Sequence, residues 1–314
     1  MAAISRDDII ACINDMAPES LAEPWDNCGL AIGGARARVW RVLVCLDVTE
    51  EIADQAIRTG ADMVVSHHPL IFKPLPSIVS GVGNGAVIYK LIQAGVDVYC
   101  AHTNVDKTHG GLNDLVAGIV GLRLMDDGRA GDSQDAPFAG PGRGAAPQEQ
   151  HPYRIGDLPR AYRPDELFEH VCARLKQKAV VVARPPQSGA VGDGVAGRTG
   201  GDGVAGVEGG AGGARLEEAS IRRLAVMCGS YGIPAPDLAA AKADAVLCGE
   251  IKHHDAIELA QMGMHVVAVG HHGSERFFVT LIEKWLKDRF PSLEVACAGF
   301  DSHPLQVYHI GCGQ

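Results

Sequence analysis

The stretch VWRVLVCLDVTEEIADQAIRTGADMVVSHH, residues 39–68, decides the fold. It reads as a buried strand over 39–49, a helix over 51–60 that closes on Gly60, and a second strand over 62–68. Apolar β-branched runs that alternate with helical patterns are typical of an α/β domain. The second strand ends on two histidines, and this position is the first indication of a functional site.

The same alternation extends to both sides of this stretch. Ser5 followed by Asp8 resembles a capping box and predicts a helix that runs through Met16. Further along the chain, the expected elements are helices over 84–95, 111–122, 164–177, 253–263 and 274–290, and strands over 96–106, 244–250, 265–270 and 294–299. The fold class that we expect is therefore α/β.

Composition divides the chain into five segments. Residues 1–125 form an N-terminal α/β portion and residues 216–314 a C-terminal one, and a helix–strand segment over 151–187 connects them. A low-complexity insertion over 126–150 and a Gly-rich insertion over 188–215 flank this connection. Such segments bury too little apolar surface to offset the entropy of ordering, so both are expected to be mobile surface insertions.

The overall composition restricts the class of protein. Hydrophobic residues are 46% and charged residues 21%, as in soluble globular proteins. The formal net charge of -10 argues against a general nucleic-acid binder, which needs a basic face. No apolar run reaches the roughly 18 residues of a membrane helix, and no signal-peptide pattern opens the sequence, so we expect no membrane segment and a cytoplasmic location. Nine cysteines without a CxxC pair are expected to be reduced core thiols.

Polar side chains that can bind metal stand at the ends of three apolar strands. In open α/β sheets, ligand sites form beyond the carboxyl ends of the strands. The candidates are His67 and His68 in SHHPLIF (66–72), His102 and Asp106 in AHTNVD (101–106), and His271 and Glu275 in GHHGSE (270–275). Successive side chains on a strand point to opposite sides, so the two adjacent histidines can reach two different ions.

The spacing of His271 and Glu275 places an imidazole and a carboxylate on one side of a helical turn, where the carboxylate can bridge two cations. Three His, one Asp and one Glu form a mixed nitrogen and oxygen ligand set, which suits zinc, iron, manganese or nickel alike. Alternatively, His271 is a cap residue, Glu275 favours the helix dipole, and Asp106 is a turn residue.

SHHPLIF, AHTNVD followed by GGLND, and GHHGSE resemble the signature motifs of the GTP cyclohydrolase 1 type 2 homologue family, also called Nif-three-like dinuclear metal-centre hexameric proteins. Four further motifs agree with this resemblance: EPWDNCGLAIG (23–33), YRIGDLP (153–159), AVMCGSYG (225–232) and DAVLCGEIKHHD (244–255). Together the motifs cover the chain apart from the two insertions. Each motif is weak by itself, and their joint occurrence is highly specific.

The resemblance implies a fold, an assembly and a ligand set. Family members are toroidal hexamers, trimers of dimers, whose chains have two related α/β subdomains with mixed sheets and a metal pair in the cleft between them. The implied cofactor is two divalent metal ions per chain. His67 and Asp106 would hold one ion, His68 and His271 the other, and Glu275 would bridge them. These are the five residues that the strand-end argument also selects.

Three more residues are candidates for catalysis. His102 could orient a ligand, Glu250 follows a strand and could act as a general acid or base, and His254 lies in the same motif as Glu250. Strand-end hydrogen bonding is the alternative for each. The Trp25-Asp26-Asn27 motif could line the cleft, although a buried Trp beside a turn is favoured. Histidines without an expected role in the site are His151, His170, His253, His303 and His309.

Two divalent ions lower the pKa of a bound water and polarise a carbonyl, imine or phosphoryl oxygen, which is suited to hydrolysis. The family name implies GTP cyclohydrolase activity, in which water attacks C8 of guanine, the imidazole ring opens and formate leaves. We therefore expect a metal-dependent hydrolase acting on a small nucleotide. The alternative is a non-catalytic metal-binding scaffold for storage, delivery or protein interaction. CGSYG (228–232) is too short a glycine signal for a triphosphate-binding loop.

Overall fold

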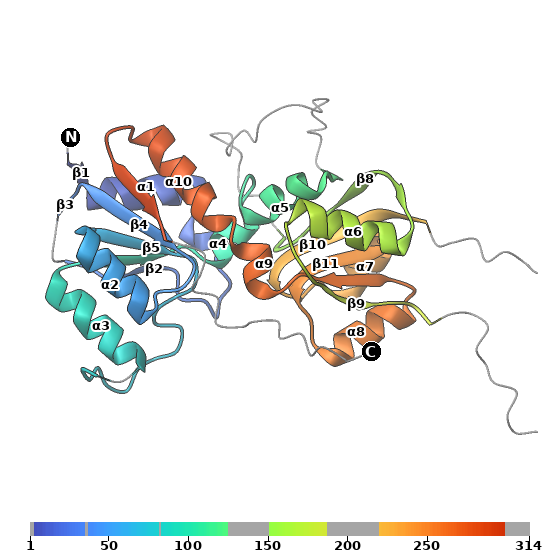
Figure 1. Cartoon of the computed structure of the whole chain (residues 1–314), viewed down its shortest axis with the longest axis horizontal. Coiled ribbons are helices and arrows are strands. Elements are labelled where there is room, and N and C mark those ends of the chain that lie inside the picture. The colour runs from blue at the N-terminus through green and yellow to red at the C-terminus, as the bar shows by residue number, and fades with distance from the viewer. Residues whose placement is uncertain (1–2, 35–36, 82, 125–150, 187–219, 299–314) are drawn as a thin grey trace, which may run out of the picture.

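The computed structural model describes residues 3–34, 37–81, 83–124, 151–186 and 220–298. Two sheets, each with helices packed on it, lie side by side along the long axis of the molecule (Figure 1). The mixed α/β class predicted from the sequence is confirmed. The two insertions, over 126–150 and 188–215, and the residues His303 and His309 fall outside the described residues.

The N-lobe comprises residues 3–107 and 278–298. Its elements are β1 (Ile4–Ser5), α1 (Arg6–Met16), the 3-10 helix η1 (Glu19–Leu21), β2 (Gly29–Ile32), β3 (Arg38–Val39), β4 (Arg41–Cys45), α2 (Glu50–Thr59), β5 (Met63–Ser66), α3 (Gly83–Ala94), β6 (Asp97–Cys100), α4 (Thr103–Lys107), α10 (Phe278–Arg289) and β13 (Glu294–Cys297).

The C-lobe comprises residues 112–124, 151–186 and 220–275. Its elements are α5 (Leu112–Val120), β7 (Arg123–Leu124), β8 (Arg154–Tyr162), α6 (Pro164–Arg174), β9 (Val181–Ala183), β10 (Ile221–Ser230), α7 (Ala235–Ala241), β11 (Ala245–Glu250), α8 (His253–Gln261), β12 (His265–Ala268) and α9 (His271–Glu275).

The N-lobe sheet has the order β13-β4-β5-β6-β2, and its first four strands are parallel. Strand β4 is buried on both faces, so that Val42 and Val44 enter one hydrophobic cluster while Leu43 and Cys45 enter another. Because β5 and β6 are parallel neighbours, the segments that follow them leave the sheet at the same edge. This edge faces the C-lobe.

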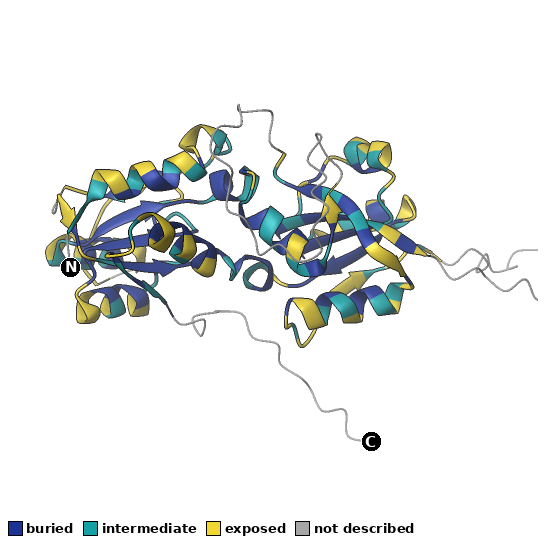
Figure 2. Cartoon of the chain, turned by 90° about the horizontal axis from the view of Figure 1, so that it is seen from above, coloured by how far each residue is buried: buried dark blue, intermediate teal, exposed yellow. Residues whose placement is uncertain are grey.

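The C-lobe sheet has the order β7-β8-β10-β11-β12-β9, with β10, β11 and β12 parallel and the other three strands antiparallel to their neighbours. One hydrophobic cluster joins the lobes, since it includes Val65 of β5, Leu224 of β10 and Trp285 of α10. Buried residues accordingly continue across the junction in Figure 2. The lobes therefore share a core and hold each other in a defined orientation.

The chain does not follow the sequence-based division at residue 216. After α9, the chain returns to the N-lobe, where β13 pairs with β4 and Glu294 donates its backbone N–H to the carbonyl of Trp40 at 3.0 Å. Buried Phe278 and Trp285 pack α10 onto the shared core. The segment over 151–187, expected to be a connection, supplies β8, α6 and β9 of the C-lobe. Sheet pairing and burial therefore outweigh chain order in forming the lobes.

Two elements differ from their expected lengths. The helix expected over 274–290 is divided, because α9 packs on β10 and β11 whereas α10 packs on α1 and β4. A single straight helix could not serve both lobes. The strand expected over 96–106 ends at Cys100, and Asp106 lies on α4, whose first turn begins at the carbonyl of His102. Ser5 precedes α1 but makes no side-chain cap.

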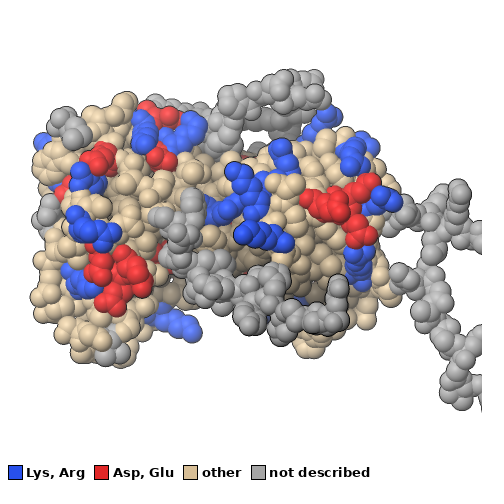
Figure 3. Space-filling model, in the orientation of Figure 1, with Lys and Arg blue, Asp and Glu red and all other residues tan. Residues whose placement is uncertain are grey.

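Other expectations concern the surface and the thiols. The eight cysteines among the described residues are free thiols. Five of them are buried, as expected of core thiols, whereas Cys28, Cys172 and Cys297 are only half-buried. Acidic and basic side chains are interspersed over most of the face in Figure 3, and a group of basic side chains gathers near its middle. In the part of the chain that the structure describes, no helix has the length and apolar character needed to cross a membrane.

Candidate metal centre

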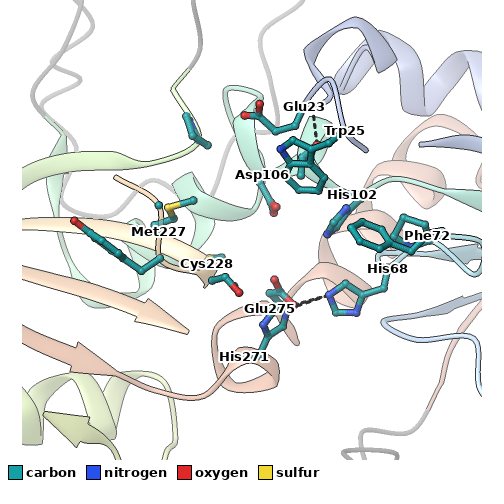
Figure 4. A pocket seen from close by; sticks show the side chains of 17 residues that line it. Glu23, Trp25, His68, Phe72, His102, Asp106, Met227, Cys228, His271 and Glu275 are labelled. Atoms are coloured by element: carbon teal, nitrogen blue, oxygen red, sulfur yellow. Dashed lines mark hydrogen bonds and ion pairs between the residues drawn. The ribbon is translucent and has the colours of Figure 1, made fainter. Parts of the chain in front are cut away.

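Side chains from both lobes converge at the junction between them (Figure 4). His68 follows β5, His102 precedes α4, and His271 and Glu275 come from α9. They line a cavity of about 670 Å³ together with Asp106. The three strand ends identified in the sequence therefore meet in space.

His67 is fully buried, and its ring is fixed from behind. Its Nδ1 lies 3.1 Å from the carbonyl oxygen of Ala101, which can only accept a hydrogen bond. Nδ1 therefore carries the proton, and the lone pair of Nε2 points into the site. This arrangement is the usual way in which a protein orients a histidine toward a metal.

His68 points to the other side of the strand end and has a different partner. Its Nδ1 lies 2.9 Å from Oδ1 of Asp47, a residue of the loop after β4. Its Nε2 lies 3.1 Å from Oε2 of Glu275. The two adjacent histidines thus face one carboxylate from two directions.

Glu275 is the central group of the site. Only 2% of its surface is exposed. Its Oε1 lies 3.6 Å from Nε2 of His67, while its Oε2 lies 3.1 Å from Nε2 of His68 and 3.1 Å from Nε2 of His271. The imidazoles of His68 and His271 approach each other to 3.2 Å between their Nε2 atoms. One carboxylate therefore reaches both groups of nitrogens with different oxygens.

Asp106 completes the arrangement from α4. Its Oδ1 lies 3.8 Å from Nε2 of His67. This oxygen and Nε2 of His67 are buried and have no hydrogen-bond partner among the described residues. Buried polar atoms without partners are costly, and orphaned nitrogen and oxygen atoms around one point suit a divalent transition metal. The donor set therefore fits the two ions that the sequence predicts.

The resemblance pairs His67 with Asp106 and His68 with His271, and this pairing stays a prediction. One group of neighbouring donor atoms among the described residues is instead His67, His68 and His102. His67 and Asp106 lie on the side of Oε1 of Glu275, and His68 and His271 lie on the side of Oε2. The donor atoms of His68, His271 and Glu275 lie within 4.8 Å of one another. Whether ions occupy both groups stays a prediction.

The pKa values of the donors reflect these environments. Burial lowers the pKa of His67 to about 4. Burial also opposes the charged form of His68, but hydrogen bonds to Asp47 and Glu275 outweigh it and raise the pKa of His68 to about 10. Burial raises the pKa of Asp106 well above its usual value. For Glu275, burial opposes ionisation, yet the three histidines around it hold its pKa well below the usual value.

The sequence as a whole resembles known proteins. A family model described as Duf34/NIF3 (NGG1p interacting factor 3) matches residues 4–202 and 206–304. The chain belongs to this family. The resemblance seen in its motifs is thereby confirmed.

Individual Duf34/NIF3 relatives agree. A Clostridium perfringens protein named GTP cyclohydrolase 1 type 2 homolog is 28% identical over 287 residues, which cover 91% of this chain and 92% of the relative. A shorter match, 44% identical over 118 residues, covers 38% of this chain and 32% of a Halalkalibacterium halodurans protein of the same name. The crystal structure of Staphylococcus aureus protein SA1388 has a TM-score of 0.73 and 24% identity, and the match covers 97% of this chain and 99% of that one.

In this Duf34/NIF3 chain, the position of Glu275 depends on two glycines of the C-lobe. Gly229 has a φ of +67°, and a Cβ built there would collide with Oε1 of Glu275. Gly249 leaves room for the hydroxyl of Ser274, which accepts a hydrogen bond from the backbone N–H of Gly229 at 3.0 Å. The glycines of CGSYG and VLCGE therefore provide the space in which α9 and its carboxylate fit.

His102 belongs to the cluster more closely than the sequence indicated. Its donor atom lies within 4.8 Å of those of His67 and His68. Its Nδ1 lies 2.9 Å from Oδ1 of Asp26. Burial opposes ionisation of Asp26, but hydrogen bonds to His102 and Thr103 hold the pKa of this carboxyl far below its usual value. Asp26 is thus a charged partner that fixes the His102 ring at the cavity.

The structure places the other two catalytic candidates differently. Glu250 lies behind His271, with Oε1 3.2 Å from its Nδ1 and 2.8 Å from Oγ of Ser230. It is not among the described residues that line the cavity. This contact favours a positioning role for Glu250 over proton transfer. His254 is exposed at the start of α8, stacks edge-on with His253, and is not brought to the cavity either.

Two residues near the site went unrecognised or were misinterpreted in the sequence. Asp47 follows β4 within residues 39–68 and was not recognised. Its position at the carboxyl end of a parallel strand could have marked it as a site residue. Trp25, expected to be buried, has 60% of its surface exposed and lines the cavity. The expectation of a buried ring was wrong because the 23–27 segment lies on α4 at the rim, where Glu23 donates its backbone N–H to Thr103.

Proposed function

We propose that this chain is a dinuclear-metal-dependent hydrolase acting on a nucleotide, with GTP cyclohydrolase-like activity as its most specific form. The observation that carries the proposal is Glu275, whose two oxygens face separate groups of imidazole nitrogens at 3.1 to 3.6 Å. Relatives that match most of the chain bear the name GTP cyclohydrolase 1 type 2 homolog, which supports the choice of substrate.

The described residues would hold two ions of zinc, iron, manganese or nickel. His67 and Asp106 would bind one, His68 and His271 the other, and Glu275 both. A metal pair in this position supplies Lewis-acid polarisation of the substrate and a water of lowered pKa. Asp47 and Glu250 would orient His68 and His271 through their Nδ1 atoms.

His102 is the group that we assign to proton transfer. Its ring lines the cavity beside the ligand cluster, and the Asp26 carboxylate at Nδ1 leaves Nε2 to exchange a proton with the substrate. Hydrolytic opening of a purine imidazole ring requires protonation of the departing nitrogen, which this imidazole can supply. His102 would then regain a proton from water.

Formate release from GTP tests the proposal. Protein loaded with each candidate metal should release formate, and the release should vanish in Glu275→Gln, which keeps the shape of the side chain but removes its charge. His102→Gln should keep its metal and lose turnover, which separates proton transfer from ligation. A metal-loaded protein that leaves GTP and a panel of phosphoesters unchanged would contradict the proposed hydrolase activity. This result would favour the alternative of metal storage, delivery or protein interaction.

We further propose the hexameric assembly, a trimer of dimers, that the family resemblance implies. Exposed apolar side chains at Ile78, Val79 and Ile92 give the N-lobe a surface that a second copy can cover. Light scattering on the purified chain measures the mass directly, and a monomer at micromolar concentration would contradict the assembly. A cytoplasmic location stays a prediction.

A further inference from the structure

One wall of the cavity is aromatic. Trp25 and Phe72 line it with 60% and 47% of their surfaces exposed, and their ring centroids lie 6.0 Å apart in an edge-to-face arrangement. Trp25 also meets the ring of His102 edge-on at 6.3 Å. Large aromatic faces left open inside a concave site are typical of surfaces that pack against a ligand.

This wall is held in place before any ligand arrives. The side-chain amide of Asn27 donates a hydrogen bond to the carbonyl of Ile71, which joins the loop of Trp25 to the loop of Phe72. The backbone N–H of Asp26 donates to the carbonyl of Glu23 at 2.9 Å. The two rings therefore form a preorganised surface, which lowers the entropic cost of binding.

The opposite wall comes from the C-lobe. Met227 faces the aromatic wall across the cavity in Figure 4, with Glu275 and His271 at the metal side. Tyr231 also lines the cavity, and its hydroxyl donates to the carbonyl of Ile233 at 2.8 Å. A thioether makes favourable contacts with aromatic rings, so both sides of the cavity suit a flat group.

The charged side chains among the described lining residues are acidic apart from the histidines. They are Glu23, Asp106 and Glu275. Glu23 is paired with Lys107 at 2.9 Å, and the other two carboxylates face the ligand cluster. Phosphate groups bind tightly where Arg, Lys or several N–H donors converge, and without metal ions the described lining residues include no Arg or Lys.

We propose that the cavity recognises its substrate by a planar heteroaromatic ring, which packs against the Trp25–Phe72 wall and faces Met227, and that this base, rather than the phosphates of a nucleotide, supplies most of the binding to the metal-free protein. This inference rests on the proposed hydrolase function and deepens it. The ring to be opened lies against the metal ligands, while any phosphates point out of the cavity and add little to binding.

Calorimetric titration of the full-length protein, with metal and after chelation, tests this assignment. The probes are guanosine, GTP and inorganic tripolyphosphate. For the chelated protein, guanosine and GTP should bind within about threefold of each other, and tripolyphosphate should not displace guanosine. Trp25→Ala and Phe72→Ala should each weaken guanosine binding at least about fivefold, as loss of a stacking partner does. Trp25→Phe should retain most of it.

The matched control is Trp40→Ala, which removes a Trp that is 43% exposed and does not line the cavity. Guanosine binding should be unchanged in this variant. GTP binding more than about tenfold tighter than guanosine to the chelated protein, or Trp25→Ala and Trp40→Ala behaving alike, would overturn the proposal. Formate release by the metal-loaded samples is scored separately. If guanosine binds but no formate is released, the proposed hydrolase activity is wrong and the proposed ring site stands. If formate is released at the same rate in Trp25→Ala and Phe72→Ala as in the wild type, the ring site is wrong and the hydrolase activity stands.

Discussion

The two lobes fix their candidate metal-binding groups in different ways. The N-lobe orients imidazoles by hydrogen bonds at the ends of parallel strands, through the carbonyl of Ala101 for His67 and the carboxylate of Asp47 for His68. The C-lobe places Glu275 on a five-residue helix and relies on space, because Gly229 has no side chain to occupy the position of the carboxylate. In the N-lobe, hydrogen bonds set the direction of the imidazole rings. In the C-lobe, the absence of a side chain at Gly229 sets the position of the Glu275 carboxylate.

The largest expected effect comes from removing the Glu275 carboxylate, which faces both groups of donors. Glu275→Ala should reduce the metal content from about two ions per chain to near zero, because both groups of donors lose an oxygen. Asp106→Ala, confined to the side of His67, should retain about one ion. Plasma mass spectrometry of dialysed protein measures both. Retention of one ion by Glu275→Ala together with loss of two by Asp106→Ala would reverse the roles assigned to these carboxylates.

The next effect tests whether space positions the C-lobe carboxylate. Gly229→Ala adds a Cβ that collides with Oε1 of Glu275, so metal affinity should fall by at least about tenfold. Gly263→Ala is the matched control, because Gly263 has a φ of +85° and nothing within 4 Å of the added carbon. Both variants should lose about 1 kcal/mol of stability from the left-handed backbone. Equal metal affinity in the two variants would show that the space at Gly229 is unimportant.

A smaller effect compares the orienting carboxylates. Asp47→Asn should weaken metal binding by about 10- to 100-fold, the usual effect of losing a partner that orients a ligand. Glu250→Gln should weaken it less, since the side chain of Glu250 is 55% exposed and water can replace it at His271. Competition with a chromophoric chelator measures both affinities. A larger loss in Glu250→Gln than in Asp47→Asn would contradict the view that hydrogen bonds matter more in the N-lobe.

The last effect is a gradual dependence of metal affinity on pH. With a pKa of about 10, His68 is charged at neutral pH in the metal-free protein, whereas His67, with a pKa of about 4, is neutral. Metal must displace a proton from His68, so its affinity should rise with pH by up to about tenfold per unit below pH 10. Titrations in buffers of different ionisation enthalpy count the released protons. Asp47→Asn removes one interaction that raises the pKa of His68, so metal binding to this variant should release fewer protons. An unchanged number of released protons would exclude His68 as their source.

The N-lobe half of the site could be predicted from the sequence because its signal is local. His67 and His68 directly follow an apolar run, and the carboxyl ends of parallel strands meet at one edge of a sheet. The five predicted ligands converge, and the mixed α/β class is confirmed. Asp106 lies on the short helix α4 and not at a strand end as expected, but its carboxylate still reaches the other four predicted ligands.

The rest depends on contacts between distant segments. No local pattern links Gly229 to Glu275, or Asn27 to Ile71, and the polar character of Glu250 gave no sign that it lies behind His271 rather than in the cavity. The exposure of Trp25 was misjudged for the same reason, because burial of a Trp is decided by what packs on it. Sheet membership of β13 also depends on pairing that spans most of the chain.

The return of β13 to the side of β4 also has a consequence for synthesis on the ribosome. Arg41 and Glu294, which pair at 2.8 Å across these strands, are separated by 253 positions in the chain. β4, β5 and β6 can associate as soon as they emerge, but the outer edge of β4 stays open until β13 has been translated. Such late closure exposes an unpaired edge to other nascent chains. Truncation after Glu275 would leave that edge permanently uncovered.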